Sequence, residues 1–169
     1  MARLLCLDLG TKMGYAIALH GKLLMSATRQ DKPSRYSGGG MRFLQFRRWL
    51  TEIWDSTQFD CVYFEEVRNH KGVDAAHVYG GMLAMLTSWC EEKKIPYEGI
   101  PVGTIKKAAC GKGNAGKGPI IAAMAERWGK PLGEADDNEA DALAILHWAL
   151  LNQPPDKIQR QPRRSSLEV

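Results

Sequence analysis

The chain has 169 residues, 44% hydrophobic and 25% charged, a composition typical of one soluble globular domain with its own core. The formal net charge of +4 is compatible with a polyanionic partner but does not indicate one by itself. The four cysteines lack metal-ligand and redox-motif spacing, and the first residues lack a signal-peptide pattern, which argues against a disulfide-stapled secreted protein; we expect reduced thiols in the cytoplasm.

The first element is an apolar run that ends in an acid. Leu4 to Leu7 predict a strand buried on both faces in the middle of a sheet, and Asp8 follows directly. A buried carboxylate is costly unless a cation or hydrogen-bond donors meet it. Asp8 is therefore either a metal ligand or the cap of the turn at Gly10 and Thr11, and this stretch alone leaves both open.

Two more strands and a helix are expected next. Tight glycine-containing turns join the apolar segments of residues 3–28, which predicts an antiparallel ribbon of three strands. Residues 29–40 are polar, end in three glycines and are predicted to form a mobile loop. A helix is predicted over 41–56, and the residues expected to face the sheet recur at helical spacing, namely Phe43, Phe46, Leu50 and Ile53.

The next apolar run also ends in acids. Residues 59–67 predict another central strand, which closes with the pair Glu65 and Glu66. Because side chains alternate along a strand, the two carboxylates point to opposite faces, and only one of them can share a face with Asp8. An exposed strand end is the alternative interpretation of the pair.

Residues 73–90 are apolar in nearly every direction around a helix. The segment is too short and too interrupted by polar residues and glycines to predict a membrane span. One face can cover the sheet, and we expect the other to meet a second copy of the chain, because a domain of this size has little core to spare. The alternative is a helix wholly inside a larger core.

Lysines and glycines concentrate after a short predicted edge strand at 95–100. A helix is predicted to start within 101–107, with Thr104 near its cap, and residues 108–118 are predicted to form a flexible basic loop. The spacing is not that of a P-loop, because no Lys-Ser or Lys-Thr pair follows the glycines. Backbone N–H groups and lysines together suit contacts with phosphodiester groups. The alternative is an ordinary solvated loop. The candidate nucleic-acid-binding residues are Lys106, Lys107, Lys112 and Lys117.

The last helix, predicted after a helix at 119–128, opens on a cluster of acids. Acids in a first turn complement the helix dipole, which is the plain explanation of this acidic start. Asp141, however, lies one turn further in, ahead of the apolar face, and Asp137 and Asn138 are its helical neighbours. Oxygen ligands aimed at the sheet are therefore available.

The end of the chain differs from the rest in composition. Residues 152–169 are polar and basic, and they are predicted to form a disordered tail that adds non-specific attraction to a polyanion. The folded domain is accordingly expected over residues 1–151.

Three separated segments thus end an apolar run with carboxylates. If Asp8, Glu65 and Asp141 converge, the site is too negative to stay ionised without either raised pKa values or bound divalent cations. All-oxygen ligands favour Mg²⁺ or Mn²⁺ over zinc. Two such ions about 4 Å apart activate a water and stabilise the leaving oxygen in phosphodiester cleavage.

Taken together, these motifs resemble those of the RuvC-like Holliday junction resolvases of the ribonuclease H-like superfamily. Each motif is weak alone, but together they occur in the family's order and at similar intervals over residues 3–150. The resemblance implies a mixed five-stranded α/β sheet, its first three strands antiparallel, flanked by helices. It also implies a homodimer that nicks four-way DNA junctions with two Mg²⁺ ions. The matching stretches are Asp8-Leu9-Gly10-Thr11, Phe64-Glu65-Glu66-Val67, Lys106 with the loop from Gly111 to Lys117, and Asp141-Ala142-Leu143-Ala144-Ile145.

Carried over residue by residue, the resemblance makes Asp8 the first catalytic acid and metal ligand, Glu65 the second and Asp141 the last. Lys106 and Lys117 match family lysines that face DNA. The chain departs from the family at one position. The family usually has another acid three residues before the last one, and this chain has Asn138 there.

Asp137 is our candidate for that fourth acid, and the amide oxygen of Asn138 is kept as a candidate metal ligand. The compact chain and this departure together suggest a divergent, phage-encoded member, which we expect to act in the cytoplasm of a bacterium or a phage-infected host.

Three other interpretations remain. Asp-Leu-Gly-Thr also occurs in actin-like and chaperone-like ATPases, but those need two such domains and more residues than this chain has. The opening motif also resembles the YqgF-like RNA nucleases, whose later Asp-Glu-Arg motif is missing here. The third is a branched-DNA-binding protein that does not cut, which only the missing fourth acid supports.

Overall fold

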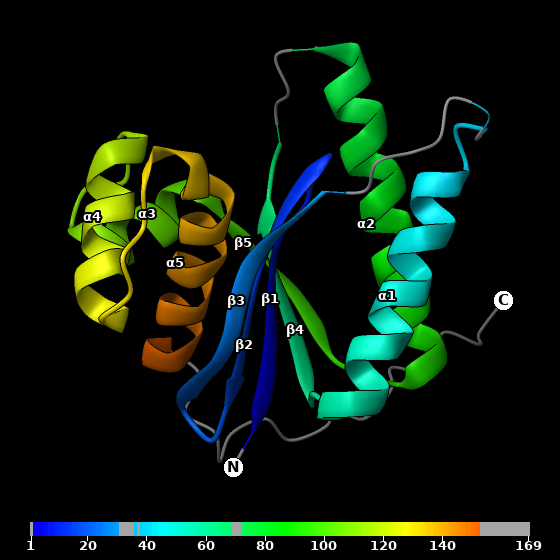
Figure 1. The fold of residues 1–169 in the computed structure, drawn as a ribbon, viewed down its shortest axis with the longest axis horizontal. Helices are drawn as coiled ribbons and strands as arrows, with labels where there is room; N and C mark the ends of the chain where they lie inside the picture. The colour runs from blue at the N-terminus through cyan, green and yellow to red at the C-terminus, as the bar shows by residue number, and fades with distance from the viewer. Residues whose placement is uncertain (1, 31–35, 37, 69–71, 153–169) are drawn as a thin grey trace, which may run out of the picture.

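The apolar runs of the sequence become the strands of one five-stranded sheet, which lies between two layers of helices (Figure 1). The computed structural model describes residues 2–30, 36, 38–68 and 72–152. No helix in these ranges is long and apolar enough to cross a membrane. The strands are β1 (Arg3–Asp8), β2 (Lys12–Leu19), β3 (Lys22–Gln30), β4 (Cys61–Glu66) and β5 (Tyr97–Pro101).

The strand order across the sheet is β3-β2-β1-β4-β5. β1 pairs antiparallel with β2, and β2 pairs antiparallel with β3. β4 runs parallel to β1, and β5 runs parallel to β4 at the edge of the sheet. The prediction of a mixed sheet whose first three strands are antiparallel is therefore confirmed. The parallel pairing brings the carboxyl ends of β1, β4 and β5 to the same edge.

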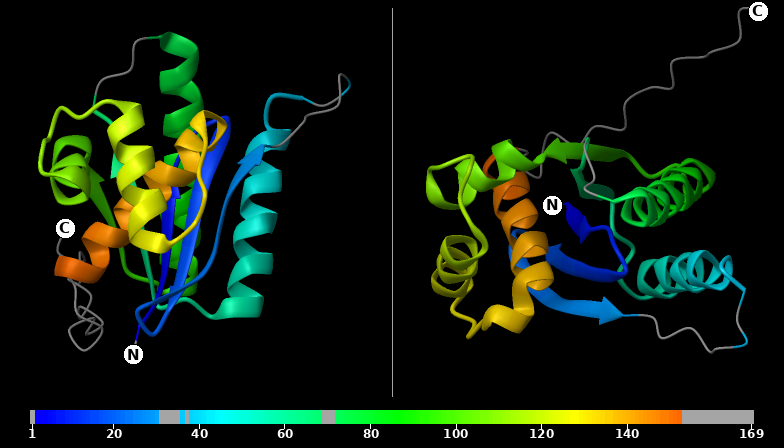
Figure 2. Two further views of the ribbon diagram at one scale, coloured as in Figure 1. Left: turned by 60° about the vertical axis from the view of Figure 1, so that its left-hand side comes forward. Right: turned by 90° about the horizontal axis from the view of Figure 1, so that it is seen from above.

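Two helices cover one face of the sheet, and three cover the other (Figures 1 and 2). α1 (Met41–Thr57) and α2 (Val73–Lys93) lie side by side on the first face. α5 (Asp137–Asn152) lies directly on the second face. α3 (Val102–Cys110) and α4 (Lys117–Trp128) pack against α5 from outside.

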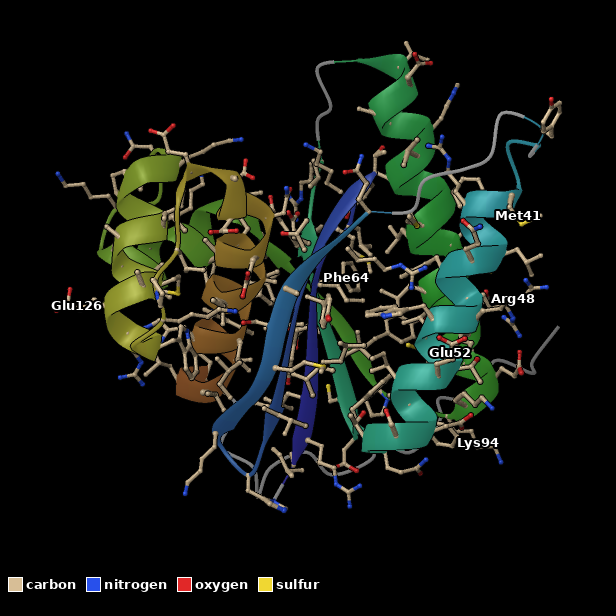
Figure 3. The ribbon with its side chains drawn as sticks, in the orientation of Figure 1. Met41, Arg48, Glu52, Phe64, Lys94 and Glu126 are labelled. Carbon is tan, nitrogen blue, oxygen red and sulfur yellow. The ribbon has the colours of Figure 1, made fainter. Side chains whose placement is uncertain are left out.

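The two faces have separate cores, because side chains alternate along the central strand. Leu4 and Cys6 of β1 belong to the core under α5, whereas Leu5 and Leu7 belong to the core under α1 and α2. β4 follows the same rule, and Phe64 points toward the α1 and α2 layer (Figure 3). A strand that is apolar on both faces, as β1 is, has to be central, as its sequence predicted.

The glycine-rich segment is shorter and more ordered than predicted. Residues 108–110 complete α3, which ends because Gly111 adopts a φ of 78° in the left-handed region. α4 begins at Lys117 rather than at residue 119, since proline is tolerated in a first helical turn. The remaining loop, 111–116, is pinned to α3, because Ala115 is buried and its carbonyl oxygen accepts a hydrogen bond from the Nζ of Lys106 at 2.8 Å.

α2 is buried on one face only. Tyr79, Met82 and Leu86 pack into the core beneath it, whereas Val73 is 70% exposed and Ala84 is exposed as well. The alternative of a helix wholly enclosed in the core of a single chain is therefore wrong. The expected second face exists, and its partner stays a prediction.

Other element ends differ by a few residues. β3 extends to Gln30, two residues beyond the predicted end, because it pairs with β2 along its whole length. Residues 31–35 and 37 of the predicted loop, and residues 153–169 of the predicted tail, lie outside the described residues. The domain limits 1–151 and 152–169 stay a prediction.

Candidate active site

Asp8 and Glu65 lie next to each other at the carboxyl edge of the parallel strands. β1 and β4 pair with Leu7 beside Phe64, so Asp8 and Glu65 are the next residues in register. The end of β4 is held from α2, because the Tyr79 hydroxyl donates to the Glu65 carbonyl oxygen at 2.9 Å. Two carboxylates from segments 57 residues apart are thus brought together by the sheet alone.

The two carboxylates also share a face. Cys6 and Tyr63, two residues earlier on their strands, belong to the core under α5. The alternation of side chains places Asp8 and Glu65 on that same face, and it places Glu66 on the opposite one. Glu66 forms an ion pair with the exposed Arg68 at 3.3 Å. Of the acidic pair that ends β4, only Glu65 faces Asp8.

The first turn of α5 comes unusually close to the sheet at Gly14. Gly14 is the β2 partner of Asp8, and a Cβ placed on it would overlap the carbonyl group of Asn138 and lie 3.1 Å from the backbone nitrogen of Glu139. Only a residue without a side chain allows the helix to lie so close. This contact brings α5 over the end of β1, so that the charge of Asp141 reaches Asp8.

Burial raises the pKa values of all three carboxyl groups, and the charge of at least one neighbouring carboxylate adds to each shift. The pKa of Asp8 is raised well above its usual range, first by burial and then by the charges of Glu65 and Asp141. Burial and the charge of Asp141 raise the pKa of Glu65 to about 7, and burial raises the pKa of Asp141 to about 6. Hydrogen bonds contribute to none of these three shifts. The nearby charges of Lys106 and Lys117 only partly offset the burial and the repulsion, so the protonated forms are favoured in the metal-free fold.

The chemistry of this cluster fits a divalent cation. All of its donors are carboxylate oxygens, which are the ligands that Mg²⁺ and Mn²⁺ prefer. A cation would also remove the repulsion that raises the pKa values. Within the described residues, no three His, Cys, Asp or Glu side chains stand close enough together to hold a metal ion in their present positions. By composition and charge, Asp8, Glu65 and Asp141 fit a divalent cation.

The raised pKa values predict how stability depends on pH. In the metal-free fold Glu65 keeps its proton up to about pH 7 and Asp141 up to about pH 6, whereas both groups lose their protons near pH 4 in the unfolded chain. The free energy of unfolding should therefore fall as pH rises through this window, by roughly 3 kcal/mol from Glu65 alone. Mg²⁺ should restore it above pH 7. Urea denaturation at pH 5 to 8, with and without Mg²⁺, measures both effects.

Glu65→Gln is the control for this pH dependence. The variant lacks the titrating carboxyl group, so its stability should vary less between pH 5 and pH 8 than that of the native chain. Equal pH dependence of the two proteins would contradict the assignment.

Asp137 lies beside the cluster, and its carboxylate is bound to Lys117 and Asn138. Its Oδ2 forms an ion pair with Nζ of Lys117, and its Oδ1 accepts hydrogen bonds from the backbone nitrogen and the Nδ2 of Asn138, at 3.0 and 3.1 Å. The ammonium group of Lys117 accordingly holds the pKa of Asp137 below its usual value. Asp137 would have to leave Lys117 to reach a cation, so its role as fourth acid stays a prediction, as does that of Asn138 as a ligand.

The Asn138→Asp variant tests which residue completes the site. A carboxylate at this position adds a charged oxygen one turn before Asp141, so Mn²⁺ should bind the DNA-free protein at least fivefold more tightly. Calorimetric titration with Mn²⁺ measures this, and Asn138→Ala and Asp137→Asn are the matched variants. Tighter Mn²⁺ binding in Asn138→Asp together with weaker binding in Asn138→Ala would identify position 138 as the fourth ligand. Weaker Mn²⁺ binding in Asp137→Asn alone would identify Asp137 as that ligand.

Two of the four predicted lysines lie at the cluster. The charge of Lys106 lowers the pKa values of Glu65 and Asp141, and the charge of Lys117 lowers those of Asp8 and Asp141. Lys117 is exposed at the first position of α4, whereas Lys106 is half-buried in α3. Both ammonium groups thus lie near the carboxylates, where Lys106 donates to the Ala115 carbonyl oxygen and Lys117 pairs with Asp137; their contact with phosphate stays a prediction.

The other two lysines are further away. Lys107 lines a surface groove together with Trp148 and Asn152, toward the end of α5 remote from its acidic start. Lys112 is exposed in the loop after α3. Neither affects the pKa of a carboxyl group in the cluster. If they contact nucleic acid, they do so away from the carboxylates.

Two residues of the site were missed in the sequence. The charge of Lys12, at the start of β2, lowers the pKa of Asp137, which places a third ammonium group near the cluster. Gly14 permits the approach of α5. Both residues could have been found from their position just after Asp8. An antiparallel strand that follows β1 through a short turn begins beside the carboxyl end of β1, where Asp8 lies.

The strand order, the antiparallel first three strands and the helix α5 packed on the central strand define an α/β protein with a ribonuclease H-like fold. The structure is similar to that of RuvC from Thermus thermophilus in complex with a Holliday junction substrate, with a TM-score of 0.76 and 21% identity over 89% of this chain and 93% of that one. A second structure of the same RuvC gives a TM-score of 0.73 at 21% identity, covering 88% and 93%.

A third similar structure is that of the yeast mitochondrial Holliday junction resolvase Ydc2. Its TM-score is 0.63 at 12% identity, covering 87% of this chain and 77% of that one. No protein-family model matches the chain, and no curated protein matches its sequence significantly. The resemblance to RuvC-like resolvases is thus confirmed at the level of the fold, and the comparisons do not support a phage origin.

Proposed function

We propose that this protein is a metal-dependent endonuclease that resolves four-way DNA junctions by paired, symmetric nicks. The observation that carries the proposal is the convergence of Asp8, Glu65 and Asp141 on one face of the sheet, in a chain with the fold of RuvC. The similar proteins are described as acting on Holliday junctions, which supports this substrate over linear DNA.

The proposed cation ligands come from the sheet and α5, and the proposed phosphate contacts come from α3, α4 and the loop between them. Asp8, Glu65 and Asp141 would hold two Mg²⁺ ions, with Asp137 or Asn138 completing the site, and Mn²⁺ would substitute. Bound cations would supply activation of water and stabilisation of the leaving oxygen. Lys106 and Lys117 would hold the scissile phosphate and balance the acidic cluster, and Lys107 and Lys112 would contact more distant phosphates.

Two copies are needed for paired nicks. A two-fold dimer presents two equivalent sites, and a four-way junction has matching two-fold symmetry. We assign the dimer contact to the face of α2 that does not pack on the sheet. Its exposed and half-exposed positions include small residues, Gly80 and Ala84, and the apolar Val73. Small side chains let two helices approach closely.

The test is cleavage of a four-way junction whose strands are end-labelled in turn. We expect Mg²⁺ or Mn²⁺ to permit two nicks at symmetric positions on opposite strands, and chelation to stop them. Linear duplex of the same sequence is the control and should stay intact. Tight junction binding with no nick in either metal would overturn the enzyme and favour a branched-DNA-binding protein. Cleavage of structured RNA in place of the junction would favour a YqgF-like nuclease.

A further inference from the structure

A closed network of charged and polar groups lies next to the candidate active site, outside the carboxylate cluster. Among the described residues, Glu139 is the buried charged residue, with its side chain 8% exposed. It forms an ion pair with Lys130, which lies in the connection between α4 and α5. The hydroxyl of Ser26 on β3 donates to the same carboxylate oxygen, Oε1, at 2.6 Å.

Every proton of the Lys130 ammonium group has a partner in this network. The Nζ of Lys130 donates to Glu139, to the Ser26 hydroxyl oxygen at 3.1 Å and to the Ser26 carbonyl oxygen at 3.2 Å. An ammonium group has three N–H donors, so its capacity is used. Removing the ammonium group of Lys130 leaves the buried charge of Glu139 unpaired, which the fold tolerates poorly. The network therefore holds Glu139 in one position.

The network holds the part of α5 that carries the candidate ligands. Glu139 follows Asn138 directly and precedes Asp141 by two residues, while Ser26 belongs to an edge strand more than a hundred residues away in sequence. The carbonyl of Asn138 rests on Gly14 of β2. The first turn of α5 is thus fixed at two points, over β2 by close packing and at β3 by the ion pair.

A role in complementing the helix dipole does not account for Glu139. An acid placed for the dipole works at the surface and needs no buried partner. Stability alone does not account for it either, because apolar residues of similar volume often stabilise a core as well as a buried ion pair does. What the ion pair adds is a specific position for the helix.

From this we infer that Glu139, through Lys130 and Ser26, is a positioning residue that sets where Asp141 and Asn138 stand relative to Asp8. The inference rests on the proposed function. Cation ligands must be held within about half an ångström of a productive arrangement, and second contacts to the ligand-bearing element commonly provide that precision. A helix free to shift on the sheet would keep the fold and lose the ligand geometry.

Three variants and two measurements besides activity test the inference. Glu139→Gln and Lys130→Met each break the ion pair, and Lys130→Arg keeps a cation at the position. Glu92→Gln breaks the surface ion pair of Arg47 and Glu92 between α1 and α2, and serves as the matched control. Mn²⁺ affinity of the DNA-free protein is measured by calorimetry, four-way junction affinity without metal by gel shift, and cleavage under single-turnover conditions.

We expect Glu139→Gln and Lys130→Met to bind Mn²⁺ at least fivefold more weakly and to cut at least tenfold more slowly, with junction affinity within twofold of the native chain. Lys130→Arg should recover most of both losses, and Glu92→Gln should change neither. Circular dichroism checks that each variant is folded. If Glu139→Gln fails to fold, Lys130→Met still tests the positioning role, because it breaks the same ion pair without changing the sequence of α5.

Two results would count against different claims. Native Mn²⁺ affinity and native cutting in folded Lys130→Met would overturn the positioning role and leave the nuclease intact. Absence of Mn²⁺ binding and of cutting in the native chain would instead overturn the proposed function, on which the inference depends.

Discussion

Asp8→Asn should abolish junction cleavage while leaving junction binding intact. Asp8 ends the central strand β1, and the charges of both Glu65 and Asp141 raise its pKa. Its amide variant keeps the shape of the side chain and removes the charge that a cation needs. We expect the single-turnover cleavage rate to fall at least a thousandfold, which corresponds to roughly 4 kcal/mol of lost transition-state stabilisation.

The same variant should be more stable than the native chain without metal. A neutral amide at the end of β1 carries no repulsion from Glu65 or Asp141, and burying it costs less than burying a carboxylate. Urea denaturation at pH 8 in the presence of a chelator should therefore show a higher free energy of unfolding. Lower activity combined with higher stability would distinguish a lost ligand from a damaged fold.

Glu66→Gln is the matched control for Asp8→Asn. Glu66 ends the same pair of acids on β4 but points to the opposite face and pairs with the exposed Arg68. Its cleavage rate should stay within a few-fold of the native rate. A native rate in Asp8→Asn, or an equal loss in both variants, would contradict the assignment of the site.

Gly14→Ala should have the largest effect on the fold. The added Cβ would overlap the backbone carbonyl of Asn138, which cannot rotate away as a side chain can. The first turn of α5 must therefore move off β2. Overpacking in a core commonly costs 1 to 3 kcal/mol, and we expect a loss of about 3 kcal/mol in the free energy of unfolding. Displacement of Asp141 by about 1 Å should lower cleavage at least a hundredfold in molecules that stay folded.

Thermal denaturation and cleavage assays measure the two consequences of Gly14→Ala. The matched control is Gly40→Ala, because Gly40 has a φ of −73° and nothing lies within 4 Å of its added Cβ. That variant should change stability by less than about 1 kcal/mol. If Gly14→Ala were equally mild, α5 would not be seated on the sheet as described, and the account of how Asp141 reaches Asp8 would be wrong.

Several parts of this architecture could be predicted because their signals are local. The four-residue apolar run before Asp8 indicated a central strand, and the run before Glu65 indicated its neighbour. Helical periodicity located α1 within one residue of its observed end. Hydrophobic runs of period two or 3.6 report directly on burial, which is why the strands and α-helices of the described residues were predicted in the right order and of the right type, whereas the short 3-10 helix Glu134–Asp136 was missed.

Element ends around the glycines were less predictable. Four glycines between Gly111 and Gly118 suggested one long flexible loop, yet two of them belong to helix caps and one to the first turn of α4. A glycine favours a helix end and a loop alike, so composition does not separate the two. The packing of Ala115 and the hydrogen bond from Lys106 decided the outcome.

The sequence by itself indicated the central strands and pointed to Asp8, the pair Glu65 and Glu66, and Asp141 as candidate acids, because each ends or interrupts an apolar run. The fold class followed from the order of these motifs, which resembles that of the RuvC-like resolvases. Only the tertiary structure decided that Glu65 shares the face of Asp8, that Asp137 pairs with Lys117 and that Glu139 is buried against Lys130. These facts depend on strand register and on helix position. Both are set by contacts between residues far apart in the chain, of which a local pattern carries no trace.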